Sequence, residues 1–77
     1  MWDISDPADP VIVSRIHNPA MQIHHSSALS WDGDVLVLGD EMGGAAAAFG
    51  CLSGGDAPTG ALWFYDVSDP ASPEQLS

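Results

Sequence analysis

Two histidines and two carboxylates are the side chains in this sequence best suited to chemistry. His24 and His25 are adjacent, and Asp40 and Glu41 are adjacent further along the chain. Imidazole and carboxylate groups held close together suit a divalent metal or acid–base chemistry. The four residues are therefore the candidate ligand-binding residues, and His24, Asp40 and Glu41 are the candidate metal ligands.

Two observations argue against a complete metal site within this chain. Side chains alternate along a strand, so His24 and His25 point to opposite faces and can hardly ligate one ion together. One histidine with one or two carboxylates is also too few for a closed zinc site, so other units of a larger fold would have to complete it. We therefore predict no catalytic residue and no cofactor, with one histidine bonded to a turn and the other solvated. A divalent metal is the alternative.

Two further motifs have simpler explanations than catalysis or metal binding. The DGD stretch at 32–34 resembles the start of a calcium loop, but the later ligands are absent because a strand begins at Val35. A hairpin turn explains it. The serines at 26–27 lie near histidines, but the chain contains no G-x-S-x-G nucleophile motif, so a hydrolase is disfavoured.

The elements that must position these side chains are short strands. β-branched and apolar runs predict four strands, at 11–16, 23–30, 35–39 and 61–67. The Asp-Gly pair within 31–34 is typical of a two-residue hairpin turn joining the second strand to the third. The aromatic residues are expected to fill the space between neighbouring sheets; they include Trp2, Trp31, Trp63, Phe64 and Tyr65.

Residues 40–60 form a glycine- and alanine-rich tract that is longer than hairpin loops normally are. We interpret the tract as a loop inserted between the third and fourth strands. Binding residues often lie in long loops on a rigid scaffold, so Met42 and Phe49 are candidates for an exposed contact. Cys51 is the only cysteine and has no partner for a disulfide within this chain.

A nine-residue motif occurs near both ends of the chain. The two copies are WDISDPADP at 2–10 and YDVSDPASP at 65–73, and the match continues from VIVS onto EQLS. Each copy reads as a strand that ends in a turn, which aspartate, serine and proline stabilise. The acidic residues of the motif are therefore turn-formers, and both copies are predicted to connect strands at the boundary between successive sheets.

The spacing of the two copies, 63 residues from Asp3 to Asp66, indicates a repeat architecture. Without about 20 inserted residues the period is about 43, within the roughly 40 to 50 residues of a four-stranded propeller blade. The predicted fold is all-β, an antiparallel four-stranded blade of a β-propeller with a Gly/Ala-rich loop insertion. We expect the end of one blade at 1–10, the next blade at 11–39 and 61–67, the insertion at 40–60, and the following unit from 68–77.

The composition of the chain limits the kinds of partner that it can bind. Eleven acidic residues stand against one basic residue, Arg15, giving a formal net charge of −10 that disfavours nucleic acid and anionic membranes. No apolar run approaches the roughly 18 to 20 residues that cross a bilayer, and the N-terminus has no signal-peptide pattern. Because 77 residues make a marginal core, we expect association with neighbouring blades or with identical chains.

The repeated motif resembles the signature of the LVIVD-repeat proteins, which are bacterial β-propellers. MWDISDPADPVIVS and LWFYDVSDPASPEQLS both fit the Y/W-D-[IV]-S-[DN]-P-x-x-P pattern, and HHSSALSWDGDVLVLGDE resembles the inner strands of a blade. The resemblance implies a multi-bladed scaffold without a common reaction, located outside the cell or in the cell envelope. It also implies that Cys51 is one half of a disulfide between blades, with its partner outside this chain.

These observations lead to two functional hypotheses. The first is a non-catalytic binding or scaffold module that presents the 40–60 loop and the axial mouth of a propeller to a protein, saccharide or small ligand. The second is part of a metal-dependent enzyme, in which several blades bring histidines and carboxylates together. Self-assembly of identical chains into a closed ring is a third possibility.

Overall fold

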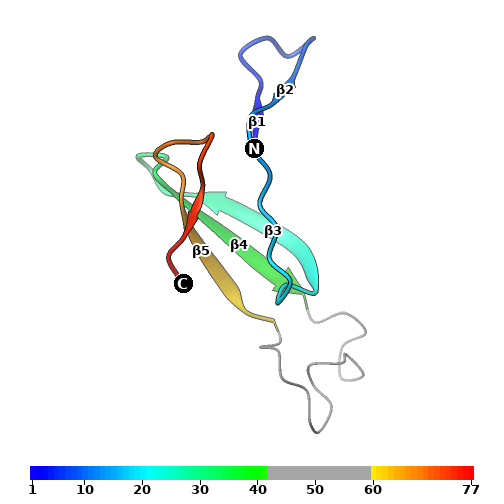
Figure 1. The fold of residues 1–77 in the computed structure, drawn as a ribbon, viewed down its shortest axis with the longest axis vertical. Helices are drawn as coiled ribbons and strands as arrows, with labels where there is room; N and C mark the ends of the chain where they lie inside the picture. The colour runs from blue at the N-terminus through cyan, green and yellow to red at the C-terminus, as the bar shows by residue number, and fades with distance from the viewer. Residues whose placement is uncertain (42–59) are drawn as a thin grey trace, which may run out of the picture.

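The described part of the chain is built from antiparallel strands. The computed structural model describes residues 1–41 and 60–77. These residues form a two-stranded sheet, β1-β2, and a four-stranded sheet in the order β3-β4-β5-β6, without a helix (Figure 1). The strands are β1 Trp2–Asp3, β2 Val11–Ile12, β3 Ile23–Leu29, β4 Val35–Glu41, β5 Leu62–Asp66 and β6 Glu74–Gln75. The predicted all-β class with a four-stranded antiparallel sheet is confirmed.

The hairpin of β3 and β4 contains the predicted turn, although its loop is longer than predicted. The Ser30 N–H donates to the Val35 carbonyl at 2.9 Å, which leaves residues 31–34 as a four-residue loop. Inside the loop the Gly33 N–H donates to the Ser30 carbonyl, also at 2.9 Å. Gly33 has a φ of 81°, a left-handed conformation that side chains with a Cβ disfavour.

Gly33→Ala is expected to destabilise the sheet by about 1 kcal/mol, because alanine is strained at positive φ. No atom lies within 4 Å of a Cβ built at this position, so the effect isolates backbone strain from steric clash. Gly33→Asn is the matched control, since asparagine tolerates this conformation. Urea unfolding followed by circular dichroism measures both variants, and equal losses for the two would contradict the strain explanation.

The two faces of the four-stranded sheet differ in how they are covered. Face A carries the buried cluster of Leu36, Leu38, Tyr65 and Val67, and Met1, Ile16, Met21 and Trp63 pack against it. Side chains alternate along a strand, so Val37 on β4 and its cross-strand neighbour Phe64 on β5 lie on face B. Leu62 and Phe64 are exposed there. Within residues 1–41 and 60–77, one apolar face is thus covered and the other is open.

The grouping of strands differs from the predicted one. Residues 11–16 were expected to begin the four-stranded sheet, but Val11–Ile12 pairs with β1, and the fourth strand of the sheet is β6. The physical reason is the compactness of the repeated turn, which folds the chain back so that the strand after it pairs with the strand before it. Each turn therefore lies inside a hairpin, and residues 13–22 separate the two sheets.

The predicted insertion also begins later than expected. Asp40 and Glu41 belong to β4, where they pair with His24 and Ile23 of β3. The predicted loop over 40–60 is thus wrong at its first two residues. Its remaining candidates, Met42, Phe49 and Cys51, lie outside the described residues.

Candidate functional site

Asp40 is a buried carboxylate whose oxygens are engaged by backbone amides. The side chain is 7% exposed and lies on face A near the end of β4. One oxygen accepts hydrogen bonds from the N–H groups of Gln22 (3.0 Å) and Ile23 (2.8 Å), and the other accepts from Gln22 at 3.1 Å. Asp40 therefore anchors the segment entering β3, a role that the sequence alone did not suggest.

The two histidines lie on different faces of the sheet. His24 is directly opposite Asp40 across the strand pair, and the register shifts between His24 and Ser26. His25 Nε2 lies 3.7 Å from a carboxylate oxygen of Glu41, and both side chains are more than half exposed. Because Glu41 follows Asp40 in the strand, this second pair lies on the opposite face.

The four sequence-predicted residues therefore lie in two places: His24 and Asp40 are cross-strand neighbours on one face, and His25 and Glu41 lie close together on the other. Among residues 1–41 and 60–77, no three His, Cys, Asp or Glu side chains lie close enough to hold a metal ion together. The predicted set of His24, Asp40 and Glu41 is divided between the two faces, and the Asp40 oxygens already accept backbone hydrogen bonds. The described residues provide no assembled metal centre.

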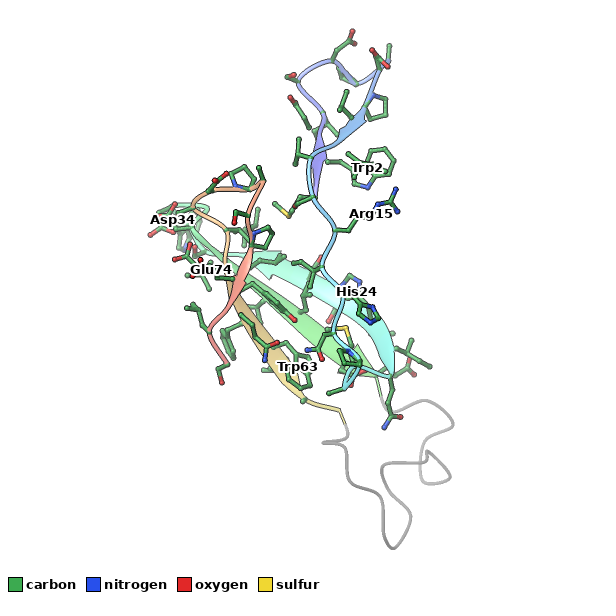
Figure 2. All side chains as sticks on the ribbon, viewed as in Figure 1. Trp2, Arg15, His24, Asp34, Trp63 and Glu74 are labelled. Atoms are coloured by element: carbon green, nitrogen blue, oxygen red, sulfur yellow. The ribbon has the colours of Figure 1, made fainter. Side chains whose placement is uncertain are left out.

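A cavity of about 420 Å³ lies over face A, next to the first hairpin. Met1 and Trp2 line it on one side, and Leu36, Leu38 and His24 line it on the other. Figure 2 shows His24 on β3 and Trp63 on β5, flanking the part of the sheet over which residues 13–22 run. The cavity thus marks the space between the β1-β2 hairpin and the four-stranded sheet.

The two copies of the repeated motif have the same structure. Trp2 pairs with Ile12 in the first hairpin, and Tyr65 pairs with Gln75 in the second, so the registers match at the 63-residue offset. The same offset relates the backbone hydrogen bonds that close the two turns. These run from Asp9 N–H to the Asp6 carbonyl and from Ser72 N–H to the Asp69 carbonyl, both at 3.0 Å.

The first aspartate of each copy is held ionised by its own turn. The Ser5 amide donates to the Asp3 carboxylate at 2.9 Å, and this bond and the Ser5 hydroxyl lower the pKa of Asp3. The Ser68 hydroxyl at 2.7 Å and the Ser68 amide at 2.9 Å likewise lower the pKa of Asp66. Both aspartates are turn-formers, as the sequence predicts.

These depressed pKa values predict an acid-sensitive contribution to stability. The contribution is present above the ordinary pKa of 3.8 and is lost as the pH falls through the lower folded-state values. Replacing both Asp3 and Asp66 with asparagine keeps an acceptor for the turn but removes the titration. The double variant should therefore lose less stability than the parent chain below about pH 4.

Urea unfolding at a series of pH values measures this difference. Asp9→Asn is the matched control, because it removes a carboxylate from the same turn without touching these serine bonds. If stability depends on pH in the same way in the double variant and in the parent chain, the titration of Asp3 and Asp66 does not contribute to the free energy of unfolding.

The equivalent hairpins differ sharply in burial. Val67, which follows β5, is 3% exposed, whereas its equivalent Ile4 is 68% exposed. The Val67 N–H donates to the Asp34 carbonyl at 2.7 Å, at the end of the sheet where Figure 2 labels Asp34 and Glu74. The difference arises because β5 pairs with β4 on its other side. The first hairpin has no corresponding strand pair in the described residues.

The first hairpin also makes specific contacts with the sheet. Met1 packs against the buried cluster on face A. The Ser14 hydroxyl donates to the Pro70 carbonyl at 2.6 Å and so joins the first hairpin to the turn of the second. Sequence reasoning did not identify these contact residues, although its alignment of VIVS with EQLS extended the repeat as far as Ser14.

The aromatic residues have different environments. Tyr65 is buried, and its hydroxyl accepts a hydrogen bond from the Asn18 amide at 3.1 Å. Trp63 is partly buried against face A. Trp31, at the tip of the β3-β4 hairpin, and Trp2 are exposed. Trp63 and Tyr65 thus belong to the core of the four-stranded sheet, whereas packing of the aromatic residues between neighbouring sheets stays a prediction.

Comparisons with protein-family models, with curated proteins and with solved structures found no match for this chain. No helix among the described residues has the length and apolar character needed to cross a bilayer. A functional assignment must therefore come from the geometry of the repeated hairpins and of the sheet on which the first one packs.

Proposed function

We propose that the chain is a non-catalytic repeat segment of a β-propeller, in which four-stranded sheets pack face to face to form a scaffold for binding. The observation that carries the proposal is the shared register and hydrogen bonding of the two hairpins, at an offset of 63 residues. Met1, at the base of the first hairpin, packs on face A of the sheet to which the second hairpin belongs. One hairpin therefore represents the edge of a preceding sheet packed against the next.

The open apolar face supports the same function. Leu62, Phe64 and Leu76 are exposed on or beside β5 and β6, although residues of this type are normally buried. In a stack of repeats each sheet has a neighbour on both faces, and each interface contributes to stability. The resemblance to the LVIVD-repeat proteins supports this assignment as well.

The binding role is assigned to the end of the sheet where β4 finishes. His25 and Glu41 are exposed there and lie beside the start of the Gly/Ala-rich tract. Exposed polar side chains on a rigid strand, next to a long connection, suit a protein or saccharide ligand. The metal-dependent alternative is weaker, because the Asp40 carboxylate already binds backbone amides.

A tandem chain tests the scaffold function. In this fusion, residues 1–77 are followed directly by a second copy of residues 15–77. The 64–77 hairpin of the first unit then stands where the second unit would have its own 1–14 hairpin. Stacked repeats should unfold together, with a higher urea midpoint and a larger m-value than the single chain. Phe64→Asp at the junction is the control and should remove the gain. Two units that unfold at the midpoint of the single chain would count against the proposal.

A further inference from the structure

Face A is contacted by Met1 of the first hairpin and by Ile16 and Met21 of the segment that follows it, and the second hairpin is equipped to make the contact that Met1 makes. Met1 packs on the buried cluster, and the Ser14 hydroxyl binds the Pro70 carbonyl. The hairpin itself is closed by bonds from the Met1 amine to the Ser14 carbonyl at 2.8 Å and from the Val13 N–H to the Met1 carbonyl at 3.1 Å. These bonds place Met1 and Ser14 side by side.

The second hairpin repeats this arrangement at the same offset. The Phe64 N–H donates to the Ser77 carbonyl, and the Leu76 N–H donates to the Phe64 carbonyl, both at 2.7 Å. At the 63-residue offset, Phe64 corresponds to Met1, Leu76 to Val13, and Ser77 to Ser14. Phe64, Leu76 and Ser77 are all exposed. The chain therefore carries a second apolar and hydroxyl-bearing edge of the kind that face A already binds.

We propose that face A of one copy binds the 64–77 hairpin of a second copy, in the place held by its own 1–14 hairpin. The inference rests on the proposed function. It names a second copy as the partner, and the 64–77 hairpin of that copy competes with the 1–14 hairpin of the first copy for face A. Phe64 of the second copy packs on the cluster around Leu38, and Ser77 of the second copy donates to the Pro70 carbonyl of the first. Since two different surfaces meet, the contact is head-to-tail and extends to further copies.

A second copy covers face A more completely than the chain's own hairpin does. The 64–77 hairpin belongs to a four-stranded sheet, so it brings β3 and β4 with it. Leu29 lies opposite Leu36 and therefore on face A, yet it remains 56% exposed. The larger apolar contact favours the exchange, whereas a charge of −10 on each copy opposes it. The association is therefore expected to strengthen with salt.

Two equivalent serine substitutions test the competition. Ser14→Ala removes a hydrogen bond only from the intramolecular arrangement, and Ser77→Ala removes its counterpart only from the intermolecular one. The association constant, measured by light scattering over a concentration series, should rise about two- to tenfold for Ser14→Ala and fall by the same factor for Ser77→Ala. Leu76→Asp, at an exposed position, should abolish association while the circular dichroism spectrum stays unchanged.

Cross-linking tests the geometry directly. In a Cys51→Ser background, a copy carrying Ser77→Cys is mixed with a copy carrying Ala71→Cys, beside the acceptor Pro70. Oxidation should link the two copies. Ala8→Cys is the matched control, because Ala8 occupies the position in the first turn that corresponds to Ala71; it should give little linkage.

Three outcomes would overturn the proposal: a monomer at all concentrations and salt levels, serine variants that change association in the same direction, or equal linkage to positions 8 and 71. The tandem chain separates this failure from failure of the proposed function. A stabilised tandem with unresponsive serine variants would leave the repeat scaffold intact and reject only the exchange between copies.

Discussion

Asp40→Ala is expected to lower the free energy of unfolding by about 3 kcal/mol, because it removes a buried, charged acceptor that two part-buried backbone N–H groups share. Those groups belong to Gln22 and Ile23, and they hold the segment that enters β3 against the end of β4. The loss should appear as a lower urea midpoint and as rapid hydrogen exchange at both amides.

Two variants and one treatment sharpen this test. Asp40→Asn keeps one acceptor oxygen and should lose about half as much stability. Glu41→Ala, at the exposed neighbouring position, should change stability by less than about 0.5 kcal/mol. A chelator should leave the parent chain unaffected. Equal losses for Asp40→Ala and Glu41→Ala would contradict the anchoring role, and destabilisation by the chelator would favour the metal-dependent alternative.

Leu38→Ala is expected to cost about 3 kcal/mol, within the 2 to 5 typical of a buried leucine replaced by alanine. Leu38 is 6% exposed and belongs to the buried cluster on face A, whereas Leu62 on face B is 61% exposed. Leu62→Ala removes the same atoms and should cost less than about 1 kcal/mol in the single chain. Urea unfolding followed by circular dichroism compares the two variants directly.

In the tandem chain, the difference in stability cost between Leu38→Ala and Leu62→Ala should become smaller. If sheets stack face to face, Leu62 of the first unit becomes buried at the junction, and its replacement should cost more there than in the single chain. Similar costs for Leu38→Ala and Leu62→Ala in the single chain would show that face A is not the core. An unchanged small cost of Leu62→Ala in the tandem would argue against stacking through face B.

The strand pattern was predictable because local rules dominate it. The alternating and apolar runs around Val35 and Leu62 set two strands of the sheet, and the Asp-Gly pair before Val35 set the turn between β3 and β4. The turn chemistry of the repeated motif was equally local, since Asp3 and Asp66 bond to serines two residues away. Such short-range interactions depend on residues that are neighbours in the sequence.

The pairing of strands and the candidate site were decided by tertiary structure. Nothing in the sequence near Val11 shows that it pairs back onto Asp3 rather than forward into the larger sheet. The division of the histidines and carboxylates into two pairs follows from the β3-β4 register and its irregularity at His25, neither of which composition reveals.

By itself, the sequence determined an all-β chain with a duplicated Ser-Asp-Pro turn, because dihedral preferences and side-chain-to-backbone bonds act over a few residues. Only the tertiary structure decided that Asp40 is an amide anchor and that Ser14 reaches Pro70, 56 positions further along the chain. Contacts of this kind depend on how whole sheets pack. The surfaces that pack against one another are formed by residues that are far apart in the sequence.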